Sequence, residues 1–166
     1  MPVQKILQLG NPTLYETCKA IQKSDLKTIP PIVQDLHDTI IAFQHRHKVG
    51  RAIAAPQIGI MKRLIYMHID RPVVFINPLL DQKSPEMMTL WDDCMSFPDI
   101  LVKVRRHTRC RITYRDLNWT EHQTHLEGDL SELLQHETDH LAGILAVQRA
   151  VDNRSIALKS QQALLT

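Results

Sequence analysis

The sequence predicts an α+β fold in which antiparallel β-sheets pack around a central helix. Three observations support this class. Residues 24–48 carry apolar side chains at helical spacing, residues 63–126 contain short apolar segments separated by turn-forming residues, and residues 128–142 again show a helical pattern. A run of strands flanked by helices is typical of α+β domains. An N-terminal amphipathic helix and a short C-terminal helix are expected to complete the architecture.

The first expected element is the amphipathic helix, which should begin near Pro30 and Pro31. Proline is tolerated in the first turn of a helix, where its missing N–H would have had no intrahelical partner. One stripe of this segment is apolar and consists of Ile32, Val33, Leu36, Ile40 and Phe43. This stripe should face the core of the domain.

Six short strands are expected between the two helical patterns. Their approximate ranges are 63–69, 73–76, 87–91, 103–104, 110–114 and 120–126. They are separated by Pro, Gly, Asn and Asp, as antiparallel strands usually are. Asp116 and Asn118 tolerate the backbone angles of tight turns, so residues 115–119 should connect the last two strands as a hairpin.

The central helix is expected over residues 128–142, and a short last helix from residue 153 or 155 to residue 165. Gly143 stands directly after the helical pattern, where glycine commonly caps a helix end. No repeat, linker or low-complexity segment interrupts the sequence. One domain is therefore expected over residues 1–166.

The length and composition are those of a soluble globular protein. The 166 residues are 43% hydrophobic and 23% charged, and the net charge of +2 does not argue for a nucleic-acid or membrane partner. Three widely spaced cysteines argue against a disulfide framework and for a reducing compartment. Because no apolar stretch approaches 18 residues and residues 1–5 lack a signal-peptide pattern, we expect a cytoplasmic protein, and we take it to be a monomer.

The central helical pattern carries His136 and His140, with Glu137 beside the first histidine. Residues four apart share one face of a helix, so both imidazoles can reach one metal ion while the carboxylate projects beside it. This spacing predicts metal-assisted hydrolysis and a metal-binding helix. The alternative is a polar helix face whose histidines are merely solvated.

A catalytic metal usually has three protein ligands and one open position, so the histidine pair requires a partner. One family of metalloproteases places a third histidine six residues after the second, but Ala146 stands there. Cys94 is the better candidate, because it follows an expected strand and a metal would hold its sulfur as thiolate. The alternative for each cysteine is a small buried hydrophobe, and we assign Cys18 and Cys110 to that role.

Residues 49–59 are rich in small side chains and include Gln57. Small residues allow another backbone to approach closely, which suits a cleft edge onto which an extended peptide adds as a strand. A structural turn explains the same composition equally well. On the residues alone, both interpretations stay open.

Three motifs of this chain, taken together, resemble those of the peptide deformylases. In chain order they are Gly50-Arg51-Ala52-Ile53-Ala54-Ala55-Pro56-Gln57, Asp92-Asp93-Cys94-Met95-Ser96 and Gln135-His136-Glu137-Thr138-Asp139-His140-Leu141. The family motifs read approximately Gly-x-Gly-x-Ala-Ala-x-Gln, Glu-Gly-Cys-x-Ser and Gln-His-Glu-x-Asp-His-Leu, in the same order. The resemblance extends over nearly the whole chain.

The resemblance implies a hydrolase that removes the N-formyl group from formyl-methionyl peptides, including nascent chains at the ribosome, and releases formate. It implies one divalent metal ion, Fe(II), with Zn or Ni in purified protein. The implied metal ligands are Cys94, His136 and His140. Glu137 would be the general acid/base, with a metal-bound water as the nucleophile. Gln57 and the backbone N–H of Met95 would hold the oxyanion.

The sequence departs from the family pattern on the substrate side of the expected site. Ala52 replaces the second glycine of the first motif, and Asp92 and Asp93 replace Glu-Gly before the cysteine. Leu101 stands where many members carry an arginine that binds the substrate backbone. The residues that we expect to contact substrate are Gly50, Arg51, Ala52, Asp92, Glu132 and Leu133.

Glu132 lies four residues before His136 and shares the helix stripe that bears the ligands. One interpretation is a solvated carboxylate that the helix dipole favours. The other is a pocket-lining residue that disfavours methionine and accepts a polar or cationic side chain, with Arg51 adding to this change. For Asp139 we expect a structural hydrogen bond behind the metal site.

Two other functions are compatible with the sequence. A divergent amidohydrolase on the same scaffold would remove a different acyl group from an amine or peptide. A scaffold whose metal only holds the fold, or a module that binds N-termini, would bind peptides tightly without turnover. Rates measured across N-acyl substrates separate these functions from deformylation.

Overall fold

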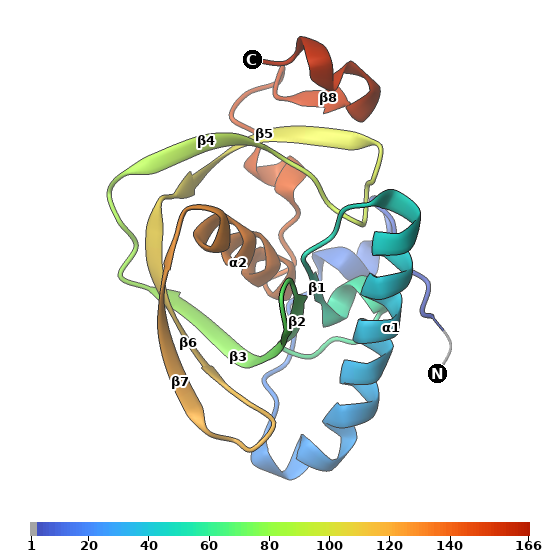
Figure 1. Cartoon of the computed structure of the whole chain (residues 1–166), viewed down its shortest axis with the longest axis vertical. Coiled ribbons are helices and arrows are strands. Elements are labelled where there is room, and N and C mark those ends of the chain that lie inside the picture. The colour runs from blue at the N-terminus through green and yellow to red at the C-terminus, as the bar shows by residue number, and fades with distance from the viewer. Residues whose placement is uncertain (1–2) are drawn as a thin grey trace.

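The computed structural model describes residues 3–166, so the first two residues of the expected domain lie outside the described part. Two antiparallel sheets and helix α2 (Gly128–Leu141) form the centre, and helix α1 (Ile29–His47) packs at one side (Figure 1). The strands curve around α2, and the chain ends beside the smaller sheet. The predicted α+β fold with a central helix is confirmed.

The larger sheet has five strands in the order β1-β2-β3-β6-β7, each antiparallel to its neighbours. They are β1 (Ala52–Ala54), β2 (Leu64–His68), β3 (Pro72–Asp81), β6 (Arg109–Arg115) and β7 (Glu121–Glu127). Among residues 3–166, β1 pairs with β2 alone. Its other edge therefore has the geometry to accept an added strand.

The smaller sheet has three strands in the order β4 (Met87–Asp92), β5 (Ile100–His107) and β8 (Ile156–Leu158). Val102, Val104 and Arg106 alternate along β5 and are all buried, as residues on the inner face of a strand are. Strand β5 packs against α2. The inner face of this sheet therefore packs against α2 and covers one side of it.

Helix α1 has Pro30 and Pro31 in its first turn, as predicted. A 3₁₀ helix, Lys23–Thr28, precedes it. Leu36 and Ile40 on its inward stripe are fully buried in an apolar cluster with residues of β1 and β2. This packing holds the chain that leads into β1 against the body of the protein.

Helix α2 is buried along most of its length, unlike a surface helix with one apolar stripe. Its buried residues are Ser131, Glu132, Leu133, Leu134, Gln135, His136, Glu137, His140 and Leu141. Gly143 follows the helix with a φ of 73°, and a Cβ there would lie 2.4 Å from the carbonyl oxygen of Tyr15. Both the backbone angle and this close approach require glycine.

The six predicted strands are present as β2 to β7, with ends that differ by a few residues. The three-residue strands β1 and β8 were not predicted as such, because three residues give too little periodicity. The short C-terminal helix is present as a 3₁₀ helix, Lys159–Leu164. Its predicted start at residue 153 or 155 is wrong, since β8 forms in this segment and pairs with the edge of β5.

The three cysteines are free and buried. Cys18 and Cys110 belong to one apolar core cluster, in the role assigned from the sequence. Burial raises the pKa of Cys18 to about 11, which keeps it a neutral thiol. Within residues 3–166, none of the helices is long and apolar enough to cross a membrane.

Candidate metal centre and its pocket

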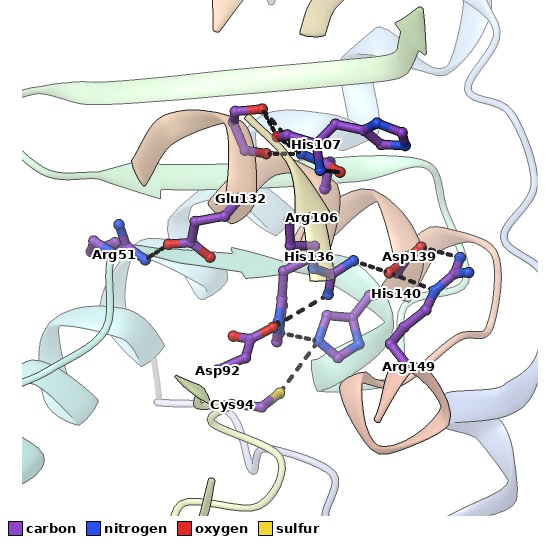
Figure 2. Close-up of polar contacts among 12 residues, drawn as sticks. Arg51, Asp92, Cys94, Arg106, His107, Glu132, His136, Asp139, His140 and Arg149 are labelled. Carbon is purple, nitrogen blue, oxygen red and sulfur yellow. Dashed lines mark hydrogen bonds and ion pairs between the residues drawn. The ribbon is translucent and has the colours of Figure 1, made fainter. Parts of the chain in front are cut away.

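Three potential ligand atoms converge between α2 and the turn that follows β4 (Figure 2). The Sγ atom of Cys94 lies 3.4 Å from Nε2 of His140, which lies 3.2 Å from Nε2 of His136. All three side chains are buried, and their ligand atoms lie within 4.8 Å of one another. The residues that the sequence nominated as ligands therefore form one cluster.

Local structure explains this convergence. His136 and His140 are one turn apart on α2, with ring centroids separated by 4.9 Å. Cys94 follows β4 closely, and its carbonyl oxygen accepts the N–H of Phe97 at 3.0 Å, which closes a turn. Cys94 and Phe97 pack in one apolar cluster with residues of β5, so the thiol is held against the helix.

The donor set fits one divalent metal ion. His136 donates its Nδ1–H to Oδ2 of Asp92 at 2.8 Å, which turns Nε2 toward His140 and Cys94 and makes it the atom available to a metal ion. Two imidazole nitrogens and a sulfur at these distances repel one another unless a cation or shared protons lie between them. A thiolate with two neutral imidazoles is a ligand set that zinc and other first-row ions accept.

The two histidines differ strongly in basicity. Burial alone would lower the pKa of His136, but Asp92 and Cys94 outweigh it and raise this pKa well above the usual value. The pKa of His140 lies well below the usual value because of burial and the neighbouring His136. The pair therefore carries at most one positive charge near neutral pH, as coupled groups at this separation do.

Arg106 lies behind the cluster and joins two carboxylates, the buried one of Asp92 and the half-buried one of Asp139. It donates from Nη2 to Asp92 at 3.3 Å and from Nη1 to Asp139 at 2.5 Å, and Arg149 donates to Asp139 at 2.9 Å (Figure 2). Burial would raise the pKa of Asp92, but His136 and Arg106 hold it below its usual value. Asp139 thus has the structural role expected for it, whereas Arg106 was missed by the sequence analysis.

Glu137 lies beside the cluster and lines the adjacent pocket. Its side chain is buried, and its Oε2 atom has no hydrogen-bond partner among the described residues. Burial raises its pKa to about 7, with His136 opposing this shift. A carboxylate of this kind can both accept and return a proton near neutral pH.

Gln57 reaches the cluster from the 3₁₀ helix Ala55–Ile58, which follows β1. Its Oε1 atom accepts the backbone N–H of Ala54 at 2.9 Å, so its amide nitrogen points the other way. That nitrogen lies 3.6 Å from Sγ of Cys94 and 3.2 Å from Oγ of Ser96. The N–H donors of Gln57 are thereby held beside the candidate metal ligands.

A pocket of about 240 Å³ opens next to the cluster. It is lined by the expected site residues Gly50, Arg51, Ala52, Gln57, Asp92, Cys94, Met95, Glu132, Leu133, His136 and Glu137. It is also lined by residues that were not among the expected site residues, namely Phe43, His47, Val49, Pro98 and Lys159. Asp93, noted only as a departure from the family motif, lines it too.

Arg51 and Glu132 form an ion pair at one side of this pocket (Figure 2). The Glu132 side chain is only 8% exposed, whereas that of Arg51 is 41% exposed. Burial raises the pKa of Glu132, and Arg51 opposes this shift. A solvated carboxylate is therefore the wrong interpretation of Glu132, which is buried, paired and pocket-lining.

Sequence comparison identifies the family to which this site belongs. A sequence model of the polypeptide deformylase family matches residues 3–155. This chain belongs to the polypeptide deformylase family. It is 34% identical to the peptide deformylase of Leptospira biflexa over 163 residues, covering 90% of this chain and 88% of that protein. It is 30% identical to the peptide deformylase of Thermotoga maritima over 161 residues, covering 95% and 93%.

Crystal structures of peptide deformylases share the fold described above. That from Thermotoga maritima has a TM-score of 0.84 at 29% identity and covers 92% of this chain and 100% of that chain. A Met-Ala-Ser-bound class I type b peptide deformylase from Acinetobacter baumannii has a TM-score of 0.82 at 27% identity, covering 89% and 98%. The deformylase fold therefore accounts for nearly the whole described chain.

Within the deformylase fold, the departures of this chain have different consequences. Asp92 was expected to contact substrate and does line the pocket, yet its carboxylate is bound to His136 and Arg106. The shorter acid thus reaches the candidate metal ligand His136. Leu101 is buried in β5 opposite Ala157 and brings no charge to the pocket.

Proposed function

We propose that this protein hydrolyses the N-formyl group of formylated peptides and releases formate, with formyl-methionyl peptides as the reference substrate of its family. The observation that carries the proposal is the convergence of Cys94, His136 and His140 beside Glu137 in a pocket of a deformylase fold. Because the chain belongs to this family, we prefer formyl removal to the removal of another acyl group.

The proposed metal ligands are Cys94, His136 and His140, and the proposed ion is Fe(II), with zinc or nickel as substitutes in purified protein. When bound, such an ion polarises the carbonyl group and supplies a water nucleophile that is deprotonated near neutral pH. The thiolate and imidazole donors support a first-row ion but do not distinguish among these metals.

We assign the proton transfers to Glu137. Its carboxylate lines the pocket, its Oε2 atom has no partner among the described residues, and its pKa is about 7. It can therefore accept a proton from the attacking water and deliver it to the amide nitrogen as the C–N bond breaks. The products are formate and a peptide with a free amino group.

We assign stabilisation of the developing oxyanion to the Nε2–H group of Gln57 and to the backbone N–H of Met95. The bond from Ala54 to Oε1 fixes the orientation of the Gln57 amide before substrate arrives. A donor that is already oriented needs no reorganisation during the reaction, which makes its contribution to the transition state large.

The peptide itself is proposed to lie along the edge of β1 that has no strand partner in the described chain. Gly50, Arg51 and Ala52 lead into this strand and line the pocket. An extended peptide can add to such an edge through main-chain hydrogen bonds, while pockets select its side chains. The Met-Ala-Ser-bound relative is consistent with peptide binding by this fold.

Formate release from formyl-Met-Ala-Ser by anaerobically iron-loaded protein tests the proposal. We expect turnover in the wild type and its loss in Glu137→Ala, with an unchanged metal content in both. Glu86→Ala, an exposed carboxylate outside the pocket, is the matched control and should keep full activity. A wild-type protein that holds its metal ion and releases no formate would overturn the proposal.

A further inference from the structure

The pocket beside the candidate metal ligands is lined by an ion pair, Arg51 with Glu132. A methionine side chain would bind better to an apolar lining. Glu132 accepts a hydrogen bond from Nη2 of Arg51 through Oε1, and both residues line the pocket (Figure 2). Leu133 provides an apolar neighbour on the same helix. The pocket therefore presents a guanidinium, a carboxylate and an apolar surface side by side.

The location of the pair places it within reach of the first side chain of a bound peptide. Glu132 is one helical turn before His136 on α2, a separation of about 5–6 Å between Cβ atoms. Only two bonds separate the formyl carbon from the Cα atom of the first residue. When that carbon lies at the ligand cluster and the peptide follows β1, the first side chain can project toward Glu132 and Arg51.

Given the proposed deformylation, we infer that Arg51 and Glu132 determine substrate specificity and select a formyl peptide whose first side chain is a neutral carboxamide, such as glutamine, over one that begins with methionine.

Hydrogen-bonding capacity favours a carboxamide at this pair. A carboxylate has about four acceptor positions and a guanidinium five N–H donors, so the pair retains capacity after the bond between Nη2 and Oε1 has formed. A carboxamide offers two N–H donors to Glu132 and one carbonyl acceptor to Arg51. The thioether of methionine has no hydrogen-bond donor. A bound methionine side chain would displace water from Arg51 and Glu132 without replacing the hydrogen bonds that this water made.

The charge balance favours a neutral side chain over a cation. Arg51 already neutralises Glu132, and at the mouth of the pocket Lys159 lies 3.8 Å from Asp93. A lysine side chain in this position would have to displace Arg51 or lie beside it. A carboxamide can bind to both partners while they stay paired.

Two substrates of nearly equal side-chain length isolate this polarity effect. We would compare kcat/KM for formyl-Gln-Ala-Ser and formyl-Met-Ala-Ser, with formyl-Lys-Ala-Ser as a third substrate. We expect the glutaminyl peptide to exceed the methionyl peptide by about tenfold or more, because a polar site strongly rejects an analogue that leaves its groups unpaired. Equal rates, a methionyl preference or a lysyl preference would overturn the inference.

The double variant R51L/E132L tests whether the pair is the cause. Only the Glu132 end of this pair is buried, and leucine at both positions leaves no unpaired buried charge, so this variant is expected to fold. Its preference should reverse in favour of the methionyl peptide. The matched control R109L/E86L removes an exposed ion pair outside the pocket and should leave the substrate ratio unchanged. A ratio that is the same in wild type and R51L/E132L overturns the inference.

A binding measurement separates this inference from the proposed function. Calorimetry with the metal-loaded protein and the unformylated peptides Gln-Ala-Ser and Met-Ala-Ser requires no hydrolysis. Tighter binding of the glutaminyl peptide, reversed in R51L/E132L, supports the pocket assignment even if no formate is released from any substrate. Absence of such a preference overturns it, whether or not the wild type is an active deformylase.

Discussion

The Oδ2 atom of Asp92 accepts the Nδ1–H of His136 at 2.8 Å, and the same oxygen accepts a hydrogen bond from Arg106 at 3.3 Å. One carboxylate oxygen thus orients a candidate metal ligand and joins it to a buried arginine. Hydrogen bonds of this kind fix the tautomer and the ring orientation of a metal-binding histidine.

Asp92→Asn should weaken metal binding. The amide removes the negative charge that faces His136. The hydrogen bond from Nδ1 of His136 then has a neutral acceptor and is weaker than one to a carboxylate. We expect metal affinity to fall by about 10–100-fold, measured by competition with a chelator. Asp93→Asn changes the neighbouring acid, whose partner is Lys159, and should leave metal affinity unchanged. Equal affinities of wild type and Asp92→Asn would show that the carboxylate does not support the ligand.

Arg106→Met should destabilise the fold as well as the site. Arg106 is 4% exposed and binds two carboxylates, so its loss leaves the buried carboxylate of Asp92 and the half-buried carboxylate of Asp139 with reduced compensation. Breaking such a buried pair costs about 3–5 kcal/mol of unfolding free energy, which urea denaturation can measure. Arg109→Met removes an exposed ion pair and should cost no more than about 1 kcal/mol. Similar losses in both variants would contradict the role of the buried network.

Cys94→Ser and Cys110→Ser separate a ligand cysteine from a packing cysteine. A serine hydroxyl is not deprotonated at neutral pH, so Cys94→Ser should purify with little metal by elemental analysis. Cys110 is buried and lies 3.4 Å from Oγ of Ser131, so its replacement should lower stability while metal content stays normal.

Metal removal provides a second readout for the same pair. At a free metal concentration of about 100 times Kd, binding stabilises the native state by about 2.7 kcal/mol. A chelator should therefore lower the Tm of the wild type and of Cys110→Ser, but not that of Cys94→Ser. A chelator-induced shift that persists in Cys94→Ser would place the metal elsewhere.

Much of the metal site could be predicted from the sequence because its elements are local. The spacing of His136 and His140 fixes their common face once the segment is helical, and Cys94 lies two residues after a recognisable strand. The expected location of Gln57 near the ligands depended on the family resemblance. Its orientation depends on the bond from Ala54, which a sequence pattern does not reveal.

Arg106 shows where sequence reasoning was incomplete. The alternation of β5 places it on the same buried face as Val102 and Val104, but the predicted strand, residues 103–104, was too short to include it. A buried arginine requires acidic partners, and in the structure these are Asp92 and Asp139. The strand β8 was missed because its three residues show little periodicity and because it depends on pairing with β5 across a long sequence separation.

Gly143→Ala should be far more destabilising than Gly10→Ala. Both glycines have positive φ angles, of 73° and 97°, which cost an alanine about 1–2 kcal/mol. A Cβ at Gly143 would also lie 2.4 Å from the carbonyl oxygen of Tyr15, whereas nothing lies within 4 Å of a Cβ at Gly10. The forced displacement adds about 1–3 kcal/mol in Gly143→Ala. Thermal unfolding that ranks the two variants equally would contradict the close approach.

Gln57→Ala should slow turnover without weakening peptide binding. The Gln57 amide is held by the N–H of Ala54 on one side, and its nitrogen lies 3.6 Å from Cys94 on the other. If this nitrogen donates to charge that develops only in the transition state, its removal lowers kcat by about 10²–10³-fold while KM changes little. Steady-state kinetics with formyl-Met-Ala-Ser, and metal analysis to confirm that the ligands still hold the ion, measure both quantities.

Gln8→Ala removes a more distant amide whose nitrogen donates to the carbonyl of Met95, at 3.4 Å, and to the carbonyl of Ile6. The kcat of this control should stay close to that of the wild type. An effect of Gln57→Ala confined to KM would assign the side chain to ground-state binding instead of oxyanion stabilisation.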